Sequence, residues 1–389
     1  MTSPPRRFWP RRRVARWGLA GLVGVGGLAA LFFGTACLSG CSSAGYLTQS
    51  ATGHVELLRA ARPVKVVIAD PATPPALRER LQLTQRIRDF AVSDLHLPDN
   101  GSYRSYADLH RSAAVWNVVA APELSLQLRT WCFPVVGCVG YRGYYSLAEA
   151  EAAAAPLRTE GLDVNVYPVP AYSTLGWMNW TGGDPLLNTF VNWPEIELSR
   201  LIFHELAHQV AYASGDTTFN ESFATAVERL GSDRWLTGEE GERIKAAQRT
   251  REGRRADFLA IVKKYRERLD ALYRGPASDD EKRRGKAEAF ADMRAEFATL
   301  KRDRWEGFTG YDKWFAEANN ASIGTQAAYD AKVEAFERLF HQQGDDFPRF
   351  YAEVQRMAAL DRADREKALS ACCGAPEAPA TAASATPRP

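Results

Sequence analysis

The feature that most constrains this chain is the segment from residue 201 to 231, LIFHELAHQVAYASGDTTFNESFATAVERLG. Apolar content and the lack of Gly and Pro over residues 199–213 predict a helix there. On that helix His204 and His208 lie one turn apart on one face, so both imidazoles can reach a single ion. The sequence therefore predicts a metal centre that holds one Zn(2+) ion.

Glu205 is the third chemically important residue of this helix. It lies about 100° around the helix from His204, so its carboxylate can flank an ion without binding it. A general base that acts on water at the ion must lie in that place. The pattern H-E-x-x-H thus predicts metal-dependent peptide hydrolysis, with Glu205 as the catalytic residue.

A catalytic zinc takes three protein ligands and keeps a fourth position open, and two His with one Glu is a known set. We expect Gly215 and Asp216 to end the first helix and Thr218 to open a second one. Glu221 then falls in the first turn of a helix that can fold back on the first, and we predict it as the third metal ligand. Two alternatives remain: Asp216 is the ligand, or Glu221 bonds to Thr218 in a capping box and turns from the metal.

Glu228 follows Glu221 by two turns on the same helix face. It could orient one of the zinc-binding histidines or hold a substrate amine. An ordinary solvated helix face explains it equally well.

At these residues the chain resembles known families. The string Asn220-Glu221-Ser222-Phe223-Ala224 after H-E-x-x-H resembles the gluzincin group of metallopeptidases. Over about residues 45–354 the chain is similar to a bacterial family of predicted zinc aminopeptidases that carry a lipoprotein signal, through the strings AYSTLGW, DPLLNT, FHELAHQ and FNESFAT. The resemblance implies that His204, His208 and Glu221 are the ligands and that Glu205 is the base.

Three functions follow as expectations. The first is a zinc aminopeptidase with a peptide substrate. The second is a zinc endopeptidase acting on periplasmic or envelope proteins, because the chain lacks the G-x-M-E-N element with which larger gluzincin aminopeptidases bind the substrate amine. The third is a non-catalytic envelope binding protein with a zincin fold.

Residues 1–40 read as an export signal. They hold six Arg and no acidic residue, followed by an apolar, Gly-rich run over residues 18–36. The run ends in Leu-Ser-Gly-Cys41, which resembles the bacterial lipobox and implies lipidation of Cys41; a single-span anchor is the alternative. Ser42 suggests an outer-membrane protein that faces the periplasm. We therefore expect a bacterial cell envelope protein that is anchored by lipid.

Removal of these 40 residues changes the formal net charge from +2 to −4, since six Arg are lost. No basic surface for nucleic acid is expected on the remaining chain.

Cys132 and Cys138 bracket five residues, and an oxidising periplasm permits a disulfide between them. Cys372 and Cys373 are adjacent and are expected to be unpaired or to pair elsewhere.

Hydrophobic periodicity predicts the other elements. Helices are expected at residues 54–61, 75–95, 146–160 and 319–354, and strands at residues 64–69, 124–128 and 164–169. One of the last two strands is a candidate edge for pairing with extended substrate, and two core strands are the alternative.

Residues 251–275 carry apolar side chains every three or four positions, and Gly275-Pro276 then breaks the helix before Ser278 caps its partner. This predicts a helical hairpin. Elsewhere, candidate pocket residues are Trp177 and Trp180, and candidate oxyanion donors are His341, Tyr311 and Tyr329.

The predicted fold class is α+β and helix-rich, a zincin-like metallopeptidase core with a small sheet and an added helical hairpin. The expected domains are a lipoprotein signal peptide (1–40), the catalytic core (41–235), the hairpin (236–304), a C-terminal helical part of the catalytic unit (305–371) and a disordered tail (372–389).

Overall fold

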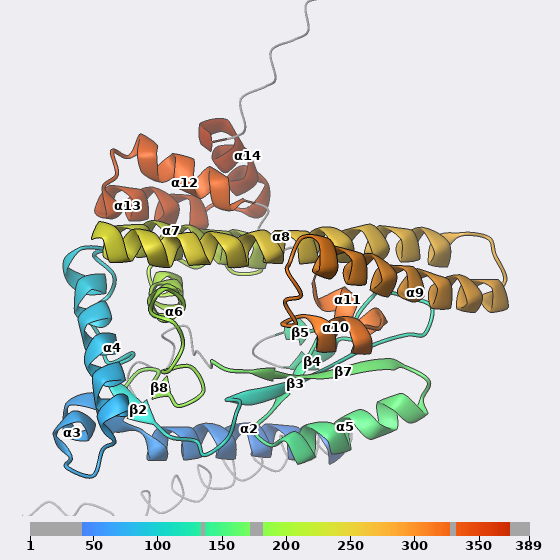
Figure 1. The fold of residues 1–389 in the computed structure, drawn as a ribbon, viewed down its shortest axis with the longest axis horizontal. Coiled ribbons are helices and arrows are strands. Elements are labelled where there is room, and N and C mark those ends of the chain that lie inside the picture. The colour runs from blue at the N-terminus through green and yellow to red at the C-terminus, as the bar shows by residue number, and fades with distance from the viewer. Residues whose placement is uncertain (1–40, 134–136, 172–181, 327–331, 374–389) are drawn as a thin grey trace, which may run out of the picture. The chain divides into compact units, whose positions relative to one another are not determined.

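The computed structural model describes residues 41–133, 137–171, 182–326 and 332–373 (Figure 1). The chain divides into two units, residues 1–56 and 57–389. The described part of the first unit is helical and belongs to α2 (Cys41–Ala60). None of the helices in these ranges is both long and apolar enough to cross a membrane.

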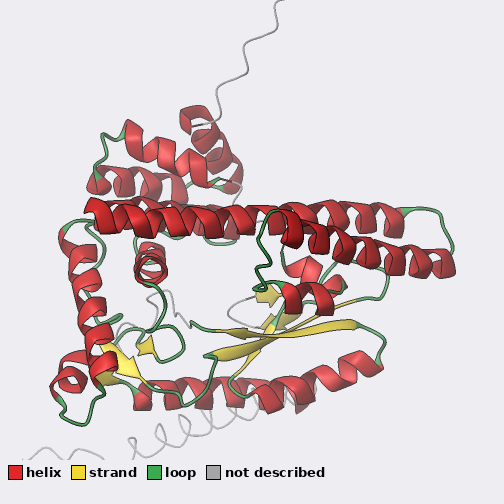
Figure 2. Cartoon of the chain, viewed as in Figure 1, coloured by secondary structure: helices red, strands yellow, loops and turns green. Residues whose placement is uncertain are grey.

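The second unit is mostly helical, with short strands between the helices (Figure 2). Its helices are α3 (Val64–Ala69), α4 (Pro75–Ser93), α5 (Leu147–Thr159), α6 (Glu195–His208), α7 (Thr217–Trp235), α8 (Gly238–Arg274), α9 (Asp279–Asp303), α10 (Asp312–Glu317), α11 (Asn320–Thr325), α12 (Val333–Gln342), α13 (Phe347–Ala358) and α14 (Arg362–Cys373). Its strands are β1 (Arg62–Pro63), β2 (Ser105–Ala107), β3 (Val115–Ala121), β4 (Trp131–Phe133), β5 (Gly137–Val139), β6 (Arg142–Tyr144), β7 (Asp163–Val169) and β8 (Leu186–Leu187). A helix-rich α+β architecture is therefore confirmed.

The main sheet has the order β6-β3-β7, with both pairs antiparallel. Its central strand β3 is almost wholly buried. Helix α5 packs against one side of this sheet and α11 against the other (Figure 1). The strand expected at residues 164–169 is confirmed as β7, which is an edge strand among the described residues. Its pairing with substrate stays a prediction.

The strand expected at residues 64–69 is wrong, because this segment forms helix α3. Val64 and Val67, three residues apart, are buried, whereas Val66 is 51% exposed. That is a helical pattern of burial, and α3 packs against α4. A six-residue apolar run does not distinguish a strand from a buried helical turn by its pattern alone.

The strand expected at residues 124–128 is also wrong, since the segment has no ladder partner in the described chain. Its leucines pack between other elements instead. Leu126 packs against the aromatic cluster of α8 to α10, and Leu128 packs near Val119 and approaches Gly324 of α11. The alternation of leucines with polar residues over 124–128 therefore belongs to a connecting segment and not to a strand of a sheet.

The described residues of the second unit form two large hydrophobic cores and a small cluster of Val119, Ala121 and Ala321. The first core gathers buried side chains of α3, α4, α6, α7, α12 and α13. The second core is formed mainly by α8, α9, α10 and the segment between α9 and α10. The hairpin expected around Gly275 corresponds to α8 and α9, and Ser278 caps α9 in a capping box with Glu281.

The helical segment expected over residues 319–354 is confirmed in its described part, where it is divided into several helices. The described part of this range contains three helices, α11, α12 and α13. Asp346 caps α13, where its side chain accepts from the Arg349 amide, and Pro348 follows in the first turn. These residues favour the start of a new helix and explain the break between α12 and α13.

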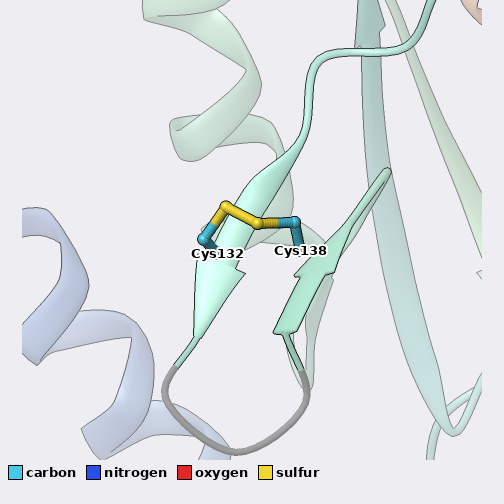
Figure 3. Close-up of a disulfide and its surroundings, with 2 residues drawn as sticks. All are labelled: Cys132 and Cys138. Carbon is cyan, nitrogen blue, oxygen red and sulfur yellow. A yellow bond between two sulfur atoms is a disulfide. The ribbon is translucent and has the colours of Figure 1, made fainter. Parts of the chain in front are cut away.

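Cys132 and Cys138 form a disulfide that joins the paired strands β4 and β5 (Figure 3). Helix α14 extends through Cys373, so the helical part of the chain reaches two residues into the predicted tail. Cys372 is disulfide-bonded, with a partner outside the described side chains.

Candidate metal centre

Helix α6 begins after Pro194 and ends at His208, so the predicted helix over residues 199–213 is shifted toward the N-terminus. Ile202, Phe203 and Leu206 are fully buried in the first core. Their burial fixes the rotation of α6. His204 and His208 therefore lie on the face of α6 that meets α7, where their side chains are 17% and 3% exposed.

The start of α7 is set by Asp216 and not by Thr218. The Asp216 carboxylate accepts from the Phe219 amide at 3.1 Å and from Arg365 Nη1 at 2.7 Å. Asp216 is thus a helix cap in a buried ion pair, and the alternative in which it binds metal is wrong. The capping box alternative for Glu221 is also wrong, because Glu221 lies one turn further along α7 and faces α6.

The connection between α6 and α7 is fixed by Asn220. Its Oδ1 accepts from the Ala213 amide at 2.7 Å, and its Nδ2 donates to the Ala213 carbonyl at 2.9 Å. Gly215 provides the positive φ of 76° that the turn requires. Further along α7, a Cβ at Gly231 would lie 2.9 Å from the Phe203 ring, so glycine permits the close approach of the two helices.

This arrangement brings three ligand atoms together. His204 Nε2 lies 3.2 Å from His208 Nε2 and 3.3 Å from a carboxylate oxygen of Glu221, and His208 Nε2 lies 3.6 Å from the other oxygen. Ligand atoms about 2.0–2.1 Å from a tetrahedral zinc are about 3.3–3.4 Å from one another. The donor set and its spacing therefore fit one zinc ion, with the residues that the sequence predicted.

Glu228 accepts a hydrogen bond from His204 Nδ1 at 2.9 Å. With its proton on Nδ1, the imidazole of His204 presents the lone pair of Nε2 toward Glu221 and His208. Of the readings that the sequence left open for Glu228, the geometry favours orientation of a histidine. By contrast, His208 Nδ1 is buried without a hydrogen-bond partner among the described residues.

The pKa values of His204 and His208 shift in opposite directions, so only one of the two rings is favoured to carry positive charge. Burial opposes the charged form of His204, but hydrogen bonds to Glu221 and Glu228 outweigh it and raise the pKa of His204 to about 10. Burial and then the charge of His204 lower the pKa of His208 to about 4. Burial raises the pKa of Glu221, but the two histidines outweigh this effect and hold its pKa below the usual value. Glu221 and Glu228 thus stabilise positive charge at the His204 ring.

Glu205 is separate from the three ligand atoms, as a general base must be. Burial, followed by the charge of Glu205, raises the pKa of Tyr103 well above its ordinary value. Tyr103 is buried and has a φ of 62°, an unusual conformation for a bulky residue. Sequence reasoning missed Tyr103, because no pattern connects it to a helix about a hundred residues away.

The remaining sequence candidates fall in different places. His341 is 64% exposed and pairs with Asp345 on the surface, so the oxyanion role predicted for it is not supported. Tyr311 lines a cavity next to the centre. Trp177, Trp180 and Tyr329 lie outside the described residues.

A cavity of about 800 Å³ adjoins the centre. His204, Glu221 and Glu228 line it, together with residues of α8 and of the segment around Tyr311. Its volume is in the range of small-molecule sites.

Helices α6 and α7 bring the candidate ligands His204, His208 and Glu221 together beside this cavity, and α6 also carries Glu205. This combination defines a candidate hydrolase centre. Residues 45–369 match the model of the family described as "Putative aminopeptidase", and the chain belongs to that family. Membership supports a peptidase-like function. No curated protein and no solved structure matches the chain significantly.

Proposed function

We propose that this protein is a zinc-dependent peptide hydrolase of the aminopeptidase kind. The observation that carries the proposal is the cluster formed by His204 Nε2, His208 Nε2 and the two carboxylate oxygens of Glu221, whose contacts of 3.2, 3.3 and 3.6 Å are close to the ligand spacing around a tetrahedral zinc. Family membership supports the peptidase class independently of this geometry.

A zinc ion, when bound by these three side chains, supplies Lewis acidity and lowers the pKa of water. Glu205 takes the proton of the attacking water and delivers it to the leaving amine. Glu228 holds His204 in the tautomer that binds metal. The cavity beside His204 and Glu221 receives part of the peptide.

The test is hydrolysis of paired peptides with free and blocked N-termini by the wild type and by Glu205→Gln. The variant should keep its zinc and lose at least about 10³-fold in kcat, because only the proton acceptor is removed. Glu240→Gln, an exposed change on α8, serves as the matched control. Turnover by Glu205→Gln at the wild-type rate would reject the role of Glu205.

The same panel distinguishes the kind of peptidase. An aminopeptidase cleaves the free peptide and leaves the blocked one intact. Equal cleavage of both peptides would instead identify an endopeptidase, and zinc content without any turnover would identify a binding protein.

We also propose that the chain is lipidated at Cys41 and faces the periplasm from the outer membrane. The support is the charged and apolar segment that ends at Cys41. Cys41→Ser should abolish incorporation of labelled fatty acid and release the protein from the membrane fraction. Membrane retention of that variant would favour a spanning anchor instead.

A further inference from the structure

One face of α8 lies against the cavity next to the candidate metal centre. Gln248, Arg251, Glu252 and Arg255 follow the three- and four-residue spacing of a helix face, and they line the cavity together with Arg254. The cavity is therefore lined by the candidate ligands, by these arginines of α8, and by Arg200 of α6 and Arg229 of α7.

The cavity's carboxylates are already engaged. Glu197 accepts from Arg251 at 2.6 Å, and Glu252 accepts from Arg200 at 2.5 Å. Glu228 is bonded to a candidate ligand, and Glu221 is itself a candidate ligand. No lining carboxylate of the described chain is thus left to bind a substrate ammonium group.

Arg254 and Arg255 differ from these paired arginines, because neither forms an ion pair within the described residues. The guanidinium carbon of Arg254 lies 4.4 Å from the centre of the Phe308 ring. This is a cation–π contact, which leaves the charge of the guanidinium without a carboxylate partner. The uncompensated charge of the cavity is therefore positive.

Arg255 also lines the cavity. Burial raises the pKa of Tyr311, and the nearby charge of Arg255 opposes that rise. Tyr311 is held by stacking on Phe258, with ring centres 4.6 Å apart. Two arginines thus border an aromatic wall in a cavity that begins at the candidate ligands.

We propose that Arg254 and Arg255 bind a carboxylate of the peptide substrate on the leaving-group side of the scissile bond. The inference rests on the proposed peptide hydrolysis. Two arginines repel the ammonium end of a peptide and bind a carboxylate through paired N–H groups. Preferred substrates are therefore short peptides that carry, beyond the cleaved bond, a free C-terminal carboxylate or an acidic side chain.

The experiment compares three tripeptides with the same N-terminal residue: a neutral peptide acid, its C-terminal amide, and an amide with Glu at the last position. We expect the wild type to have a lower KM for one or both peptides that carry a carboxylate. Arg254→Gln and Arg255→Gln should each raise that KM about 10-fold, since a charged hydrogen bond is lost. The KM for the neutral amide should change much less.

Arg243→Gln is the matched control, an exposed change of the same type on α8 outside the cavity. A preference for the peptide acid identifies the C-terminal carboxylate as the bound group, and a preference for the Glu amide identifies the side chain. Equal KM values for all three peptides in the wild type, or equal effects of the variants on all three, would overturn the proposal.

Equilibrium binding of the same peptides to Glu205→Gln separates this inference from the proposed function. In Glu205→Gln, the two peptides that carry a carboxylate should bind more tightly than the neutral amide, and this difference should be lost in Glu205→Gln/Arg254→Gln. That result supports the proposed carboxylate site even if the wild type hydrolyses nothing. If all three peptides are hydrolysed with equal KM and equal affinity, the proposed carboxylate site at Arg254 and Arg255 is rejected. The proposed peptidase function is then unaffected.

Discussion

The α6–α7 pair and the α8–α9 hairpin are both two adjacent helices, but they use polar side chains in opposite ways. In α6–α7 polar groups are buried and bonded to specific partners, as with Asn220, which is 2% exposed, and Asp216. In the hairpin the charged pairs, such as Arg268 with Asp292, lie on the surface. Buried polar bonds fix the α6–α7 geometry, whereas the hairpin depends on the apolar second core.

The largest expected effect is a loss of stability on truncating a buried leucine in either core. Comparing the two cores tests whether only the first one also supports zinc binding. Leu206→Ala in the first core and Leu269→Ala in the second should each lower the free energy of unfolding by about 2–5 kcal/mol, because both side chains are fully buried. Only Leu206→Ala should also weaken zinc binding, since Leu206 orients α6. Denaturant unfolding and zinc titration measure the two effects. Loss of zinc affinity in Leu269→Ala would show that the second core also supports the metal centre.

Asp216→Asn should lower the free energy of unfolding by about 3 kcal/mol, because it leaves Arg365 buried without a carboxylate. Burial raises the pKa of Asp216, but the bonds from Phe219 and Arg365 outweigh it and hold the pKa below 3.8. A lowered folded pKa stabilises the protein above about pH 3.8, and this contribution is lost as pH falls through the folded pKa.

Urea unfolding of wild type and Asp216→Asn at pH 7 and at low pH measures this effect. The difference between them should shrink below the pKa of the folded aspartic acid. A constant difference across that range would contradict the assigned role of the ion pair.

Glu228→Ala should weaken zinc binding by about 10- to 100-fold, because His204 loses the partner that sets its tautomer. Competition with a chelator measures the affinity, with the exposed change Glu240→Ala as control. An unchanged zinc affinity would show that Glu228 does not act through His204.

The smallest effect is expected on the hairpin surface. Asp292→Asn removes an exposed ion pair with Arg268 and should cost at most about 1 kcal/mol. Thermal unfolding compared with Asp216→Asn gives the contrast directly. Equal losses from the two substitutions would remove the difference between the helix pairs.

The sequence predicted the site better than the sheet. His204, Glu205, His208 and Glu221 are close in sequence, so helix geometry alone brings the histidines together and a short connection adds Glu221. The capping signals of the hairpin at Ser278 were equally local. Local patterns therefore predicted the candidate ligands that the structure brings together and the helix pairs.

The rest depended on contacts between distant parts of the chain. Tyr103, whose pKa the charge of Glu205 raises, and Arg254, which lines the cavity, belong to other segments of the chain, and no periodicity predicts these relations. Leu126 alternates with polar neighbours as a strand would, yet it packs against the second core and its segment has no ladder partner among the described residues. The hydrophobic pattern specified burial without specifying the partner.

The most direct test of the central claim is the zinc content of the purified protein, measured by elemental mass spectrometry. We predict one zinc per chain in the wild type and in Glu205→Gln, and loss of zinc in His204→Ala and Glu221→Ala with the fold retained. A wild type without stoichiometric zinc when zinc is supplied, or unchanged zinc content in both ligand variants, would contradict the account.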